Sequence, residues 1–250
     1  MSKHAALNTF GRSSNPAISG FANIKPGYGN SFAISERMTI AGTAQKTMFL
    51  LVCCFAASVY GWNNPGFMVP ALILGLIAAM VTIFKKEWAG TTAPVYAGLE
   101  GVALGGITVM AEAQFPGIGL QAVSLTFGVF FTLLLCYMSG IIKATENFKL
   151  MIVSATGGIF LLYMASFVLG FFGISIGFIH SSGAMGIGFS MVVVGIAALN
   201  LVLDFDFIED AAEAGLPKHM EWFGAFSLMV TLVWLYLEIL RLLSKLRSRR

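Results

Sequence analysis

The sequence predicts an all-α integral membrane protein with seven transmembrane helices. Hydrophobic residues make up 57% of the 250 residues, and charged residues make up only 11%, which is about half the charged share of an ordinary soluble domain. A surface in contact with water cannot be built from so few charges. The apolar residues also form long continuous runs, whereas a transmembrane β-barrel shows alternating segments of about ten residues.

Seven apolar segments are long enough to cross a bilayer, which takes about 20 residues in a helix. Two of the short connections between them, residues 63–66 (Asn-Asn-Pro-Gly) and 114–117 (Gln-Phe-Pro-Gly), consist of turn-forming residues. These turns predict antiparallel hairpins of helices one and two and of helices three and four. The segments lie at about residues 47–62, 68–86, 93–112, 119–142, 150–173, 182–208 and 221–246.

The first 45 residues differ in composition from the rest of the chain. They are rich in Ser, Asn, Gly and Ala and lack the apolar core of a secretory signal peptide. We expect residues 1–45 to form a flexible cytoplasmic tail and residues 46–250 to form one seven-helix membrane domain.

Loop charges predict the orientation, because Lys and Arg concentrate on the cytoplasmic side. The connections expected on one side of the membrane carry Lys46, Lys85, Lys86, Lys143 and Lys149, whereas the opposite loops around Asn63, Glu112 and His180 carry no Lys or Arg. The N-terminus is therefore expected in the cytoplasm. A seventh crossing would place the basic residues after Arg241 outside, so the last segment either crosses despite its charges or enters part way and returns.

Several classes of function lack the residues they need. The net charge of +3 is small and concentrated at the chain ends, so we expect no nucleic-acid partner. Cys53, Cys54 and Cys136 lie in apolar runs and show no metal-ligand spacing. The GxxxxGK[ST] and HExxH motifs are absent. We therefore expect a protein that is not an enzyme and has no cofactor.

Acidic residues inside the apolar segments are the candidate functional residues. An unpaired charge in hydrocarbon costs at least about 2.5–3.5 kcal/mol, so a buried acid normally has a partner or a task. Asn200 and Asp204 lie four residues apart and form one polar stripe on the sixth helix. Asp206 points to roughly the opposite side and is expected to be a solvated residue at the helix end.

Glu238 lies in the seventh segment, and two interpretations of it remain open. Arg241 is three residues later on the same face and predicts a local ion pair. Alternatively, Glu238 meets Asp204 from the neighbouring helix, and the two carboxyl groups share a proton because adjacent buried anions repel. Such a pair would serve as a proton sensor or a cation site.

Glu100 in the third segment also has two interpretations. It is either a protonated acid that forms a hydrogen bond between helices, or a third acid along the same ion pathway.

The end of the sequence resembles a known family. Leu-Asp-Phe-Asp-Phe-Ile-Glu closes the sixth segment from Leu203, and Trp-Leu-Tyr-Leu-Glu-Ile-Leu-Arg-Leu-Leu follows about thirty residues later. Together with Ala-Pro-Val-Tyr-Ala-Gly-Leu-Glu-Gly from Ala93, these motifs resemble the bacterial branch of the transmembrane Bax inhibitor motif family. The resemblance covers about residues 40–246 and is most specific at the sixth and seventh helices.

The resemblance implies a seven-helix fold in which the last helix is central and the other six surround it. It also implies a pH-sensitive calcium leak in a bacterial inner membrane, with calcium as the transported ion and protons as the regulator. Asp204 and Glu238 match the family's proton-sharing pair and would bind calcium transiently. The bacterial family member has aspartate where this chain has Glu238. Lys85 or Lys86 falls near the family's basic latch residue, but lysine lacks the bidentate fork of arginine.

Two other functions remain open at this stage. Intramembrane acids also suit a proton-coupled transporter of another solute, although no pair of interrupted helices occurs in matching halves. A membrane partner of a protease or stress pathway would use the same acids structurally. The sequence does not fix the oligomeric state.

Overall fold

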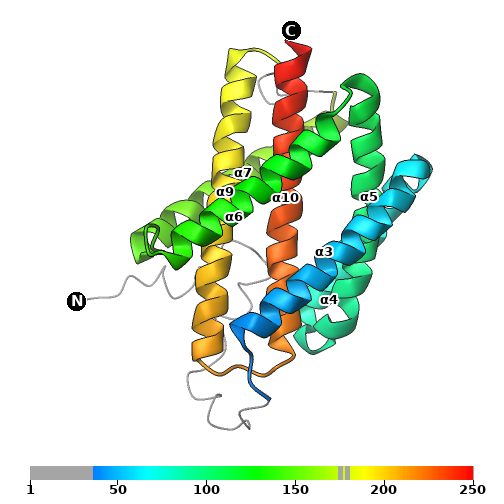
Figure 1. Ribbon diagram of the computed structural model, residues 1–250. Coiled ribbons are helices and arrows are strands. Elements are labelled where there is room, and N and C mark those ends of the chain that lie inside the picture. The colour runs from blue at the N-terminus through cyan, green and yellow to red at the C-terminus, as the bar shows by residue number, and fades with distance from the viewer. Residues whose placement is uncertain (1–35, 174–176, 178–180, 250) are drawn as a thin grey trace. The chain divides into compact units, whose positions relative to one another are not determined.

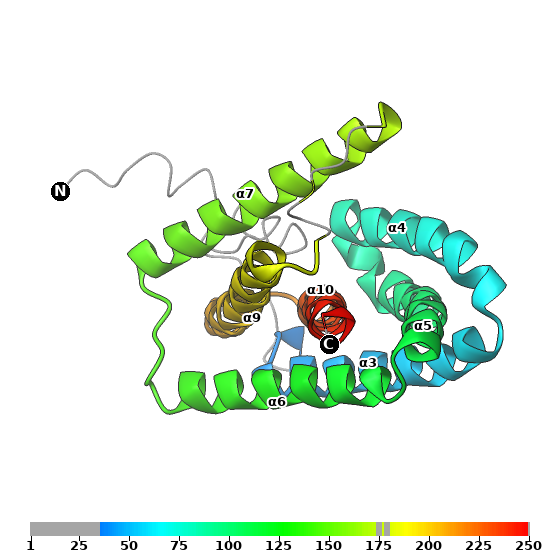
Figure 2. The same ribbon diagram turned by 90° about the horizontal axis from the view of Figure 1, so that it is seen from above.

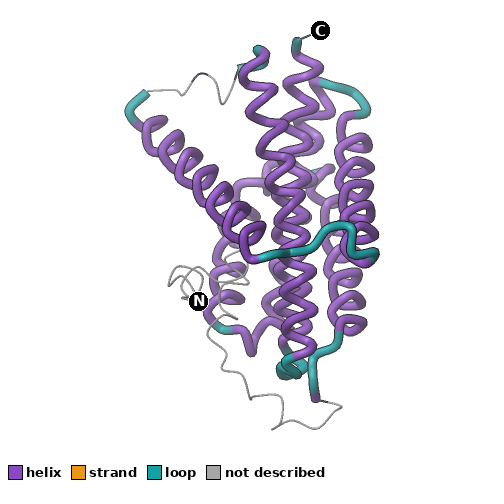
Figure 3. The backbone as a smooth tube through the Cα atoms, turned by 90° about the vertical axis from the view of Figure 1, so that its left-hand side faces the viewer, coloured by secondary structure: helices purple, strands orange, loops and turns teal. Residues whose placement is uncertain are grey.

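The computed structural model describes residues 36–173, 177 and 181–249. This part of the chain contains seven helices that are long and apolar enough to cross a membrane (Figure 1). No strand occurs among these residues, only helices and loops (Figure 3). The prediction of an all-α membrane protein is confirmed. The spanning helices are α3 (Ile40–Asn63), α4 (Met68–Phe84), α5 (Ala89–Gln114), α6 (Ile118–Met138), α7 (Glu146–Phe171), α9 (Ala184–Glu213) and α10 (Met220–Ser248).

The first helix begins earlier than the apolar pattern predicts. The Thr39 side chain accepts a hydrogen bond of 2.9 Å from the backbone N–H of Gly42, which caps α3 so that it starts at Ile40. Residues 40–45 are thus helical although they were expected in the tail. Residues 1–35 of the predicted tail lie outside the described part.

The last helix is continuous. Helix α10 runs through 29 residues from Met220 to Ser248, which corresponds to about 44 Å at 1.5 Å per residue. This length exceeds the roughly 30 Å of a bilayer's hydrocarbon core. Of the two alternatives for the last segment, an uninterrupted helix favours a full crossing over a return within the membrane.

Helix α10 is also the most buried of the seven. In its most apolar stretch 83% of the residues are buried, against 11–56% in the other six helices. This burial agrees with the expectation of an inner helix. Its position at the centre of the other six stays a prediction.

The helices form two compact units. The α3–α5 unit contains α3, α4 and α5 together with residues 204–213 of α9 and 220–230 of α10. The α6–α7 unit contains α6 and α7 together with the parts of α9 up to residue 203 and of α10 from residue 231. Helices α9 and α10 thus contribute to both units.

Within the α3–α5 unit, α5 packs against both α3 and α4 (Figure 2). Glycines bring the α3 and α5 backbones together, because Gly61, Gly101 and Gly105 each face the main chain of the opposite helix with no room for a Cβ. At Gly101 an added Cβ would overlap the carbonyl of Cys54. Close backbone approach through small residues is a main source of helix packing energy in lipid.

Replacing Gly101 with alanine should destabilise the protein by about 1–3 kcal/mol, because the extra methyl group forces the two backbones apart. The matched control is Gly98→Ala on the same helix, where nothing lies within 4 Å of an added Cβ. That variant should gain up to about 1 kcal/mol from helix propensity. Thermal unfolding of both purified variants in detergent provides the measurement, and equal melting temperatures would contradict the close contact.

Candidate functional site

The Glu238 carboxylate lies in a hydrogen-bonded cluster with Tyr163 of α7 and Arg241 of α10. Glu238 is only 2% exposed. Arg241 Nη1 donates to both carboxylate oxygens, at 2.9 and 3.1 Å, and to the Tyr163 hydroxyl at 2.7 Å. The Tyr163 hydroxyl lies 3.1 and 3.2 Å from the same two oxygens. A buried carboxylate is thus compensated by a cation and a hydroxyl, which are the partners it needs in a medium of low dielectric constant.

This geometry confirms the local ion pair between Glu238 and Arg241. Arg241 follows Glu238 by three residues, so one turn of helix brings the two side chains together. The role of Tyr163 was missed in the sequence. It lies 75 residues before Glu238, and no local pattern connects the two positions.

Asn200 and Asp204 are both buried, with 2% and 0% of their surfaces exposed. Asn200 Nδ2 donates to Thr156 Oγ1 of α7 and to the Ile196 carbonyl, each at 2.8 Å. The polar stripe on α9 therefore faces protein and not lipid. Asp204 belongs to the α3–α5 unit and Glu238 to the α6–α7 unit, and their pairing stays a prediction.

Asp206 differs from its expected position. Helix α9 continues to Glu213, so Asp206 is not at the helix end, and it is half-buried where a solvated residue was expected. The acidic residues that follow on the same helix are Glu209, which is exposed, and Asp210, which is half-buried.

Glu100 of α5 is 8% exposed. Its carboxylate lies against Gly75 of α4, where an added Cβ would be 3.3 Å from Oε2. Cys54 of α3 and Tyr96 of α5 are close enough to interact with it electrostatically. The structure places Glu100 in the α3–α5 unit and Glu238 in the α6–α7 unit, so a shared pathway stays a prediction.

The two candidate latch lysines each lie over an aromatic ring. Lys85 Nζ is 5.3 Å from the ring centre of Trp88, and Lys86 Nζ is 5.6 Å from that of Phe223. Both are cation–π contacts within the α3–α5 unit. A latch to a helix acid stays a prediction for either residue.

Two further polar contacts escaped the sequence analysis. Glu221 at the start of α10 is 1% exposed and forms a salt bridge with Lys46 of α3. Lys245 near the end of α10 is 6% exposed and donates to Ser190 Oγ at 2.8 Å and to the Gly186 carbonyl at 3.1 Å. The sequence showed Lys46 only as an orientation signal, since its partner lies 175 residues away.

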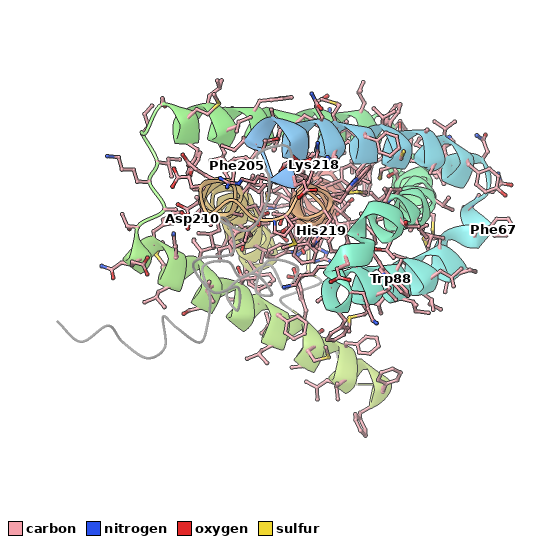
Figure 4. All side chains as sticks on the ribbon, turned by 90° about the horizontal axis from the view of Figure 1, so that it is seen from below. Phe67, Trp88, Phe205, Asp210, Lys218 and His219 are labelled. Carbon is pink, nitrogen blue, oxygen red and sulfur yellow. The ribbon has the colours of Figure 1, made fainter. Side chains whose placement is uncertain are left out.

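His219 lies in the loop between α9 and α10, next to Lys218 (Figure 4). It is half-buried. Burial lowers the pKa of His219 from its ordinary value of 6.5, and the charge of Glu87 opposes this change. The neutral imidazole is therefore favoured in the folded protein.

Removing Arg241 should destabilise the protein, because it leaves the Glu238 carboxylate without its cation. We expect Arg241→Gln to cost about 1.5–3 kcal/mol, the value of a hydrogen bond to a charged group. Arg247→Gln on the same helix is the control, since Arg247 forms an exposed bond with Gln121 and should change stability by under about 0.5 kcal/mol. A double-mutant cycle with Glu238→Gln measures the coupling energy between the two side chains. A coupling energy of zero would show that the ion pair does not stabilise the protein.

His219 should add a pH dependence to stability. Because its pKa is lowered in the folded state, its contribution is present above pH 6.5 and is lost as the pH falls below 6.5 toward the folded-state pKa. His219→Gln should therefore reduce the fall in melting temperature between about pH 7 and pH 5. Identical pH profiles for the variant and the wild type would contradict this.

Comparison with known proteins agrees with the resemblance of the helix motifs. No curated protein and no solved structure gave a significant match to the chain. Among the described residues, no group of three or more His, Cys, Asp or Glu side chains is placed to hold a metal ion. The family model described as Bax inhibitor 1 like matches residues 4–248. Nearly the whole chain is included in that match, and the protein therefore belongs to the Bax inhibitor 1 like family of integral membrane proteins.

Proposed function

We propose that this protein is a pH-sensitive calcium leak channel and that buried carboxyl groups on α9 and α10 gate it. The observation that carries the proposal is the cluster that Tyr163 of α7 forms with Glu238 and Arg241 of α10, two membrane-spanning helices. Intramembrane ionisable residues typically mark ion pathways and proton relays, because placing a charged side chain in lipid is unfavourable in free energy.

A proton on Glu238 would change this cluster directly. Protonation removes the negative charge that holds the Arg241 guanidinium, and it turns one acceptor oxygen into a donor. Tyr163 connects the same carboxylate to α7, so its contact must rearrange as well. A change in proton occupancy is thereby converted into a change in the contact between α7 and α10.

Asp204 is proposed as the second acid of the gate. It is fully buried, and in contact with Glu238 the two carboxyl groups would share one proton at neutral pH. Calcium is a hard cation that prefers six to eight oxygen ligands. Two carboxylates would bind it loosely and transiently, which suits a leak better than a storage site.

The same proposal includes the cellular setting. We place the protein in a bacterial inner membrane with its N-terminus in the cytoplasm, on the basis of the loop lysines and the family. Lys86 is the stronger latch candidate of the two lysines, because its contact with Phe223 already joins it to α10.

Calcium flux into dye-loaded liposomes should depend on pH for the wild-type protein and lose most of that dependence in Asp204→Asn and Glu238→Gln. Each substitution keeps the shape of the side chain and removes its titration. The measurement is the initial flux rate across a pH series in reconstituted, purified protein. Glu209→Gln is the matched control, since Glu209 lies on α9 and is exposed, and its pH profile should equal that of the wild type.

Unchanged pH dependence in both acid variants would exclude them from gating. Flux against a calcium gradient when a proton gradient is imposed would indicate a proton-coupled transporter. No flux at any pH, together with capture of a defined membrane protease, would indicate a partner protein.

A further inference from the structure

Three glutamates are more than nine-tenths buried in this protein, and they differ sharply in their partners. Glu221 accepts from the backbone N–H and the hydroxyl of Thr39, at 3.0 and 2.9 Å, and pairs with Lys46. Glu238 has Arg241 and Tyr163. Glu100 has neither a hydrogen bond nor a salt bridge to any residue that the structure describes. Two of the three carboxylates are compensated as anions, and Glu100 is not.

No cation forms a salt bridge with Glu100 among the residues that the structure describes. Helix α4 contains no titratable residue between Met68 and Phe84. Helix α3 contributes the thiol of Cys54, and α5 contributes the phenol of Tyr96 one turn before Glu100. The Tyr96 ring packs edge-on against Phe226 of α10, with ring centres 5.1 Å apart.

Residues 204–213 of α9 add carboxylates to this unit but no cation, and the charged residues of α3 and of residues 220–230 of α10 pair with each other. Glu221, on the first turn of α10, and Lys46 of α3 are bound to each other. The two groups that interact electrostatically with Glu100 are the Cys54 thiol and the Tyr96 phenol. Groups of these two types are neutral at physiological pH. Nothing near the Glu100 carboxyl would favour its anionic form.

We propose that Glu100 is an intramembrane proton-binding site whose carboxyl is neutral at pH 7 and seals the contact between α4 and α5. An isolated carboxylate in an apolar interior is so unfavourable that the group takes up a proton instead. The neutral acid fits against the Gly75 backbone, where even a methyl group would be tight at 3.3 Å from Oε2.

Loss of this proton in alkaline solution then has a mechanical consequence. The resulting anion needs water or a cation as a partner, and on the α4 side its Oε2 already lies against Gly75. We expect helix α4 to move away from α5 so that such a partner can reach the anion. This proton site lies in the α3–α5 unit, and it does not depend on calcium being the transported ion.

Infrared spectroscopy of the purified full-length protein tests the protonation state directly. The difference spectrum of wild type minus Glu100→Gln at pH 7 should contain the carbonyl band of a protonated carboxylic acid, and the band should disappear as the pH is raised. Glu209→Gln is the matched control and should give no such band, because Glu209 is exposed and does not lie in the apolar interior. A carboxylate band in place of the carbonyl band at pH 7 would overturn the proposal.

A membrane-soluble carbodiimide gives a second, chemical readout. The proton of the neutral carboxyl passes to a carbodiimide nitrogen while the carboxyl oxygen adds to the central carbon, and acyl migration leaves a stable N-acylurea. Mass mapping should find this adduct on Glu100 with a yield that falls as the pH rises, and little adduct on Glu221 or Glu238. Adducts on Glu221 and Glu238 with none on Glu100 would contradict the assignment.

Hydrogen exchange tests the mechanical part. Raising the pH should increase amide exchange in α4 around Gly75 more in the wild type than in Glu100→Gln at the same pH. Equal exchange in both proteins would show that Glu100 binds a proton without sealing the α4–α5 contact, and would overturn that half of the proposal.

Discussion

Compensation of charge in an apolar medium is the constraint on which the polar parts of this protein depend. Lipid supplies no water to a buried carboxylate, so a cation, a donor or a proton must neutralise it. The chain uses a neighbouring arginine for Glu238, and a lysine from another helix for Glu221. For Glu100 the part of the chain that the structure describes offers neither. The same residue type thereby acquires different chemistry at three positions.

Close packing of α3, α4 and α5 makes it more important that buried carboxyl groups are neutralised. Gly61, Gly101 and Gly105 allow the backbones of α3 and α5 to touch, and Gly75 allows α4 to lie against Glu100. A looser bundle would leave space for water and would tolerate charges without partners. In this unit the small residues therefore allow the helices to pack closely. Under our proposal for Glu100, this close packing also favours the neutral form of its carboxyl group.

The proposed ion pathway, as opposed to a purely structural role for the buried acids, is supported by membership of the Bax inhibitor 1 like family. Acids that only stabilise a fold are often replaceable by apolar residues of similar size, since burying an ion pair gains little net stability. The burial of Asp204 and of Glu238, which Arg241 contacts, is easier to understand where proton occupancy matters. The contact of Tyr163 with Glu238 supplies a route by which such occupancy reaches a second helix.

The sequence by itself determined the seven spans and the local Glu238–Arg241 pair, because hydrophobic run length and a three-residue helical spacing are local properties. It also showed Asp204 and Glu100 as acids within spans. Only the tertiary structure revealed Tyr163 beside Glu238, Lys46 beside Glu221, and Glu100 against Gly75. Each of these contacts joins residues on two different helices. The apolar pattern of a helix predicts that it inserts into lipid, but it does not specify which other helix packs against each face of that helix.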